Sequence, residues 1–195
     1  IANDFPNLTE PLLALGSVNI KKDKFTDGIF FIEKAYKISN DESIINQLIQ
    51  ICKKLSYNDL VEKYLITYKR NHSESVSLKY LKINLAIEDS QFYYALKLLK
   101  ELINSGEVNL NLLEKLIYVS KNLNRLNDTF KLIEDLHFKD SQNIIYPLLL
   151  AEIELSQKNQ KEALNWFLNS LNIDKLNINL RHQVANLSES VFNYS

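Results

Sequence analysis

The sequence repeats itself with a period of about 34 residues, and this period limits the fold more than any other feature. It is seen in an interface column whose members follow one another at nearly equal intervals: Gly28, Val61, Ala95, Thr129 and Ala163. Further along each unit, the same register finds an apolar column: Ile32, Leu65, Leu99, Ile133 and Phe167. A fixed period of about 20 to 50 residues is typical of stacked repeats, in which each unit covers the apolar face of its neighbour.

Each repeat has the pattern of two helices joined by a short polar loop. With only 3 Gly and 3 Pro in 195 residues, the chain has few sharp turns. The segment 107–123 shows helical spacing of its buried-type residues, at Leu113, Leu116, Ile117 and Ser120. Similar segments predict an all-α chain of eleven helices, at about 8–21, 25–38, 42–55, 58–70, 75–89, 91–104, 107–123, 126–138, 143–157, 160–172 and 176–193.

In the first helices of the repeats, apolar residues also recur at fixed positions, except in the third repeat, which has lysines there. The two clearest columns are Leu12, Ile45, Lys79, Leu113 and Pro147, and then Leu15, Leu48, Lys82, Leu116 and Leu150. Lys79 and Lys82 therefore make the third repeat the least regular. Residues able to cap a helix start lie at the breaks: Asn40, Asp41, Asn58, Ser73, Ser75, Ser90, Asn109, Asn127, Asp128, Ser141 and Asn159.

This organisation resembles the tetratricopeptide repeat (TPR), whose pattern combines a Leu-Gly pair with later Ala and Phe positions. The first repeat carries Leu12, Leu15, Gly16, Gly28, Ile32 and Ala35, and the last full repeat carries Leu150, Ala151, Ala163 and Phe167. The resemblance implies a right-handed α-solenoid of antiparallel helix hairpins. Its expected parts are an N-terminal extension (1–8), five repeats (9–41, 42–75, 76–109, 110–143 and 144–174) and a terminal segment (175–195), either a capping helix or part of a sixth repeat.

The resemblance also implies where a partner would bind. In TPR proteins the first helices line a concave groove, and the matching positions here are Leu13, Ser17, Asn46, Gln50, Lys53, Tyr80, Asn84, Glu114, Tyr118, Lys121 and Glu152. Four of these lie one repeat apart, at Gln50, Asn84, Tyr118 and Glu152. These four residues suit contacts to the backbone of an extended peptide, with Tyr80 and Tyr118 as flat anchors. The predicted function is a non-catalytic scaffold for a protein or peptide partner; simple solvation of these positions is the alternative.

No arrangement of residues in the sequence predicts an enzyme or a cofactor. The three histidines, His72, His137 and His182, are far apart and have no metal-ligand spacing, so we expect them at the surface. Cys52 falls on the packed side of its helix, which favours a buried, inert thiol over a nucleophile. The glycines are isolated, so no phosphate-binding loop is present.

Charge and hydropathy limit the kinds of partner that the chain is expected to bind. The chain has 23 basic and 24 acidic residues, and this net charge of −1 disfavours nucleic-acid binding, although a pentatricopeptide-like RNA reader is a further alternative. No apolar run approaches the roughly 20 residues of a membrane span. Self-association or a spacer role also stays open, within a larger protein or assembly. One cysteine slightly favours a reducing compartment such as the cytoplasm but also suits the periplasm, so localisation stays open.

Overall fold

The computed structural model describes residues 8–73 and 75–193, with side chains up to Val191. These residues form eleven helices and no β-strand, which confirms the predicted all-α class. The expected extension 1–8 falls almost entirely outside the described residues, as does the end of the segment 175–195. The helices are α1 (Thr9–Lys21), α2 (Phe25–Ser39), α3 (Glu42–Lys54), α4 (Asn58–Asn71), α5 (Val76–Glu88), α6 (Phe92–Asn104), α7 (Leu110–Asn122), α8 (Leu126–Lys139), α9 (Ile145–Ser156), α10 (Gln160–Ile173) and α11 (Ile178–Asn193).

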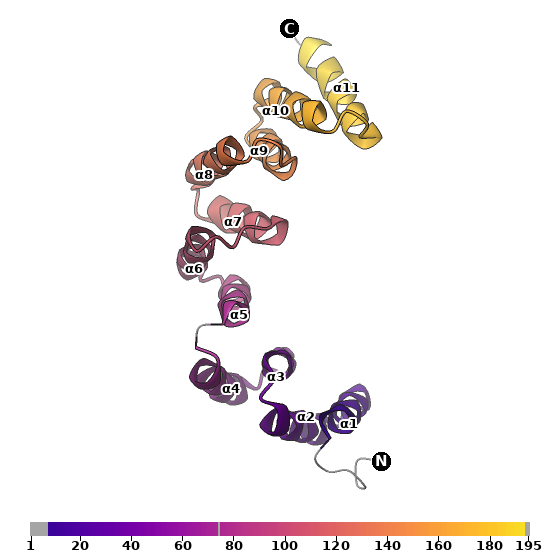
Figure 1. Ribbon diagram of the computed structural model, residues 1–195, viewed down its shortest axis with the longest axis vertical. Coiled ribbons are helices and arrows are strands. Elements are labelled where there is room, and N and C mark those ends of the chain that lie inside the picture. The colour runs from indigo at the N-terminus through magenta and orange to yellow at the C-terminus, as the bar shows by residue number, and fades with distance from the viewer. Residues whose placement is uncertain (1–7, 74, 194–195) are drawn as a thin grey trace. The chain divides into compact units, whose positions relative to one another are not determined.

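The chain divides into two compact units, and each is a run of helices that pack on their neighbours in sequence (Figure 1). Unit 1, Ile1–Asn84, contains α1 to α4 and most of α5, and in it α1 packs on α2, α2 on α3, and α3 on α4. Unit 2, Leu85–Ser195, contains the end of α5 and α6 to α11, with each helix from α6 onward packed on the next. In unit 2, α7 also contacts α9, so the first helices of two successive hairpins meet.

The repeat period is visible in the backbone of the hairpin turns. A residue with positive φ, between 55° and 66°, recurs at Asp23, Ser56, Ser90, Asn124 and Lys158. After each of them, the next amide N–H donates to a carbonyl five residues earlier, at distances of 2.7 to 2.9 Å. This closure is the Schellman motif, which ends a helix by bonding its otherwise unpaired carbonyls. The five turns follow one another at the same intervals as the five members of the interface column, so backbone and sequence share one period.

These turns allow a direct stability prediction. A side chain in the left-handed region is strained, and glycine removes that strain. We therefore expect Lys158→Gly to raise the free energy of unfolding by about 0.5 to 1 kcal/mol. The matched change Lys97→Gly, on the exposed face of α6, should lower it by about 1 kcal/mol. Thermal unfolding followed by circular dichroism measures both, and equal effects of the two changes would contradict the turn assignment.

Side-chain caps form at some of the predicted positions and not at others. The Asp41 carboxylate accepts from the amide of Ser43 at the start of α3, and the Asn109 side chain accepts from the amide of Leu112 at the start of α7. Ser75 caps α5 in the same way. The prediction for Ser90 was wrong, because this residue ends α5 in the left-handed region and does not cap α6.

Small residues, in the interface column and opposite it, lie where two helices approach closely. In the first hairpin, a Cβ atom added at Gly16 would collide with the Ile32 side chain, and one added at Gly28 would come within 2.6 Å of Ile20. Ala95 and Ala163 are both 0% exposed, as expected for residues at helix crossings, whereas Val61 of the same column is half-buried.

The fourth hairpin has a polar pair in the same place. Thr129 belongs to the interface column and is 2% exposed. Its hydroxyl donates to the hydroxyl of Ser120 on α7, with the two oxygens 2.6 Å apart. Because buried polar groups need a partner, this bond lets the fourth repeat place a threonine where its neighbours have alanine.

A second column, not used in the sequence analysis, holds the first helices in the core. Its members recur once per repeat at a constant interval and are at most 7% exposed: Ile44, Leu78, Leu112, Tyr146 and Leu180. In α5 this column takes the place of the interrupted ones, because Leu78 and Leu81 are buried while Lys79 and Lys82 are half-buried. The helix α11 keeps the same register, and Leu180 packs with Ala151 and Phe167 of the last hairpin.

Candidate functional site

The predicted groove residues of unit 2 lie on α7 and α9, the two first helices that contact each other. Glu114, Tyr118 and Lys121 are exposed on α7, and Glu152 is exposed on α9. Tyr118 leaves half of its surface accessible, and the edge of its ring packs against Phe92, with ring centroids 6.1 Å apart and an interplanar angle of 71°. This contact holds an exposed aromatic ring in a fixed orientation.

The charge of Glu114 acts on the carboxyl group of Glu152. Partial desolvation by the surrounding protein, followed by the negative charge of Glu114, raises the pKa of Glu152. The Glu152 side chain is thus exposed to solvent and also partly surrounded by protein atoms. A cationic group of a ligand would reduce the repulsion between these two negative charges.

The predicted groove residues of unit 1 are less exposed. Asn46, Gln50 and Lys53 on α3, and Tyr80 and Asn84 on α5, are all half-buried. Lys53 and Tyr80 already interact with neighbouring groups of the chain. The structure therefore places the predicted residues in two sets, one in each unit, and the set in unit 2 is the more accessible.

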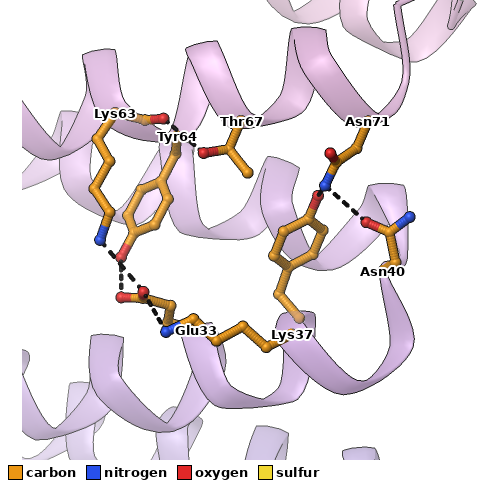
Figure 2. A pocket seen from close by; sticks show the side chains of 8 residues that line it. Glu33, Lys37, Asn40, Lys63, Tyr64, Thr67 and Asn71 are labelled. Atoms are coloured by element: carbon orange, nitrogen blue, oxygen red, sulfur yellow. Dashed lines mark hydrogen bonds and ion pairs between the residues drawn. The ribbon is translucent and has the colours of Figure 1, made fainter.

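A pocket that the sequence analysis did not predict lies in unit 1, between the second helices α2 and α4 (Figure 2). It has a volume of about 600 Å³ and is lined by Glu33, Tyr36, Lys37, Asn40, Lys63, Tyr64, Thr67 and Asn71. Every lining residue is polar or carries a polar tip. The pocket is therefore suited to a ligand that forms hydrogen bonds.

At one end of the pocket, a single carboxylate joins the two helices. Glu33 accepts a bond of 2.8 Å from the Tyr64 hydroxyl, and the ammonium groups of Lys37 and Lys63 lie 3.0 and 3.3 Å from its Oε1. Burial alone would raise the pKa of Glu33, but these hydrogen bonds outweigh it and the pKa lies below its usual 4.5. Burial and the bond to Glu33 raise the pKa of Tyr64 well above its usual value, so its hydroxyl stays a donor.

At the other end, an amide performs the same joining role. The side-chain nitrogen of Asn71 donates to the Tyr36 hydroxyl at 2.8 Å and to the side-chain oxygen of Asn40 at 3.0 Å. Figure 2 shows these two bonds on the side of the pocket away from Glu33. The Glu33–Lys37 pair has the i,i+4 spacing that a sequence reveals, but the partners on α4 depend on how the two helices pack.

The remaining chemically active side chains that the sequence analysis considered are Cys52 and the three histidines. Cys52 is 0% exposed, and burial, followed by the charge of Glu33, raises its pKa to about 11, as expected for an inert thiol. His182 is exposed, but His72 and His137 are half-buried, contrary to the expectation of surface positions. His72 is 3.4 Å from a carboxylate oxygen of Glu42. His137 packs its ring against a tryptophan of α10.

Metal-binding clusters and membrane-spanning helices are both absent from the residues that the structure describes. Over these residues, no cluster of three or more His, Cys, Asp or Glu side chains is arranged to hold a metal ion. None of the helices within the described ranges combines the length and apolarity that a membrane crossing requires.

Comparison with known proteins finds similar structures but no similar sequence. No protein-family model and no curated protein matches the chain. Among solved structures, yeast Tom70 has a TM-score of 0.64 at 15% identity, over 99% of this chain and 42% of that one. A fragment of MamA from Desulfovibrio magneticus RS-1 has a TM-score of 0.58 at 11% identity, covering 87% and 97%. YrrB, described as a TPR protein with an unusual peptide-binding site, has a TM-score of 0.52 at 11% identity, covering 93% and 94%.

Proposed function

The chain has a TPR-like fold of sequential helix hairpins, and on this basis we propose that it is a non-catalytic scaffold that binds a segment of a partner protein. TPR-like folds typically mediate protein–protein interaction. The binding surface in this proposal is the exposed side of the first helices, and in unit 2 it is formed by Glu114, Tyr118, Lys121 and Glu152.

The observation that carries this proposal is the state of Tyr118. Its ring is half exposed and is already oriented by the edge contact with Phe92. Tyrosines of this kind are over-represented among the residues that dominate binding energy, because they offer a large contact area and lose little conformational freedom on binding. The neighbouring carboxylates Glu114 and Glu152 repel phosphate groups, so they favour a protein ligand over RNA on this surface.

Replacement of Tyr118 by alanine tests this function. A central aromatic anchor contributes about 2 kcal/mol or more, so we expect roughly thirtyfold weaker binding of the partner. The measurement is affinity capture of partner proteins on the immobilised chain, followed by titration of the captured protein. Tyr57→Ala is the matched control, because Tyr57 is also a partly exposed tyrosine but lies at a hairpin turn of unit 1. A partner that binds the parent and both variants equally well would contradict the proposal.

A second candidate function is self-association. Near α11, Leu176 and Ile178 leave 84% and 67% of their surfaces exposed. Exposed apolar side chains on a repeat array are suited to contact with a second copy. Light scattering over a range of protein concentrations distinguishes the two functions, since a peptide-binding monomer keeps a constant mass and a self-associating chain does not.

A further inference from the structure

The pocket between α2 and α4 offers more hydrogen-bond donors than its own acceptors use. The ammonium groups of Lys37 and Lys63 each make one bond, both to Glu33, and keep further N–H groups for a ligand. The Tyr36 hydroxyl accepts from Asn71 and keeps its proton. Among the described residues, none of these remaining donors has an acceptor. These donors suit a ligand that carries acceptor oxygens.

The charge of the pocket points to the same kind of ligand. Glu33 is the only carboxylate among the lining residues, and it faces two lysines, so the pocket carries one net positive charge. The ammonium groups are accessible, because the Lys37 and Lys63 side chains are 70% and 53% exposed. A carboxylate from outside can thus reach both lysines without displacing Glu33.

The polar groups of the pocket are held in place by buried side chains. Tyr36 and Tyr64 are 5% and 2% exposed, so their rings are fixed in the core while their hydroxyls face the pocket network. The side-chain oxygen of Asn40 accepts a hydrogen bond from Asn71, so both N–H groups of the Asn40 amide stay available as donors. The Asn71 side chain keeps its oxygen as an acceptor. Together these two amides can bond both the C=O and the N–H of an extended peptide backbone.

On each of the two helices, an exposed apolar side chain lies about one helical turn from a lining residue of the pocket. Phe30, which is 61% exposed, precedes Glu33 by three residues on α2. Ile66, which is 54% exposed, follows Lys63 by three residues on α4. Residues three apart share a helix face, so each apolar side chain is one turn from a charged group of the pocket. This pattern suits a ligand that carries both apolar and acidic residues.

We propose that the α2–α4 pocket is a second docking site, for an acidic, extended segment of a partner protein. A side-chain carboxylate of the segment lies between the ammonium groups of Lys37 and Lys63, and the amides of Asn40 and Asn71 bond its backbone. An apolar residue of the segment contacts Phe30 or Ile66. The site is on the second helices of unit 1, so it is separate from the first-helix surface around Tyr118 and does not depend on that surface binding a partner.

The test measures the binding of a defined peptide by fluorescence anisotropy. The probe is a fluorescein-labelled peptide of alternating Glu and Leu, amidated at its end so that only side-chain carboxylates are present. We expect the full chain to bind it, and the double variant K37Q/K63Q to bind it at least about tenfold more weakly, because charge-assisted hydrogen bonds are lost. The same peptide with Gln in place of Glu should bind the parent chain as weakly as the double variant binds the acidic probe.

The control is the double variant K22Q/K54Q, which removes the same charge from exposed positions at the ends of α1 and α3. This variant and Tyr118→Ala should both bind the acidic probe like the parent. Equal losses in K37Q/K63Q and K22Q/K54Q would show that only general charge attraction operates, and would overturn the proposal. A parent chain that does not bind the probe below about 1 mM would also overturn it. Circular dichroism of each variant verifies that the helices are intact.

Discussion

Replacing Gly28 by leucine is expected to destabilise the first hairpin by about 3 kcal/mol or more, at the upper end of the usual range for overpacking. A Cβ atom at this position would come within 2.6 Å of the Ile20 side chain and within 3.1 Å of the backbone oxygen of Gly16. The Ile20 side chain could move, but the backbone of α1 can give way only if the two helices separate. The leucine would thus force α1 and α2 apart.

The measurement is chemical denaturation combined with hydrogen exchange. Since a helix array is stabilised mainly by contacts between neighbours, the loss should appear first as faster exchange of the amides in α1 and α2. Thr26→Leu adds a leucine to an exposed position of the same helix and should change stability by less than about 0.5 kcal/mol. If Gly28→Leu and Thr26→Leu gave the same stability, the close approach of α1 and α2 would be disproved.

Replacing Ala163 by leucine should have the second largest effect, a loss of about 1 to 3 kcal/mol. Ala163 is 0% exposed on α10, which packs on α9, so three further carbon atoms would have to displace packed neighbours. The nearby core also supports α11, because Ala151, Phe167 and Leu180 form one buried cluster. We therefore expect α11 to loosen together with α10.

Thermal melting and exchange of the α10 and α11 amides measure this effect. Lys161→Leu is the control, since Lys161 is exposed in the first turn of the same helix. An unchanged melting temperature for Ala163→Leu would show that the repeat register is misplaced in the last hairpin, even though it holds elsewhere.

The fold was predictable because the same period appears in several columns of the sequence. Interface positions such as Gly28 and Ala163 differ in residue type, but both lie where two helices pack closely. Their regular spacing in the sequence reveals this shared position. The helix α5 was harder to read. Leu78 and Lys79 are adjacent, and a sequence column fixed on position 79 misses the leucine that is actually buried. The positive φ of Ser90 and Lys158 was also not predictable, because neither residue favours the left-handed region.

The residues of a candidate site were predictable only where they all lie on one helix. Glu114, Tyr118 and Lys121 share the outward side of α7, which the helical period reveals. The contact of Tyr118 with Phe92 depends on how α6 and α7 pack, so the sequence contains no sign of it. The α2–α4 pocket was missed for the same reason: its bonds join residues of different repeats, such as Glu33 with Tyr64.

The central claim is that a partner binds on the exposed side of the first helices, and site-specific cross-linking tests it most directly. The photoreactive residue benzoylphenylalanine is placed at position 118, and in a second sample at position 138, where Phe138 is 91% exposed at the end of α8. After irradiation with bound partner, mass spectrometry identifies the cross-linked peptides. We expect a cross-link to the partner from position 118 and none from position 138. A partner that cross-links from position 138 and not from position 118 would contradict it.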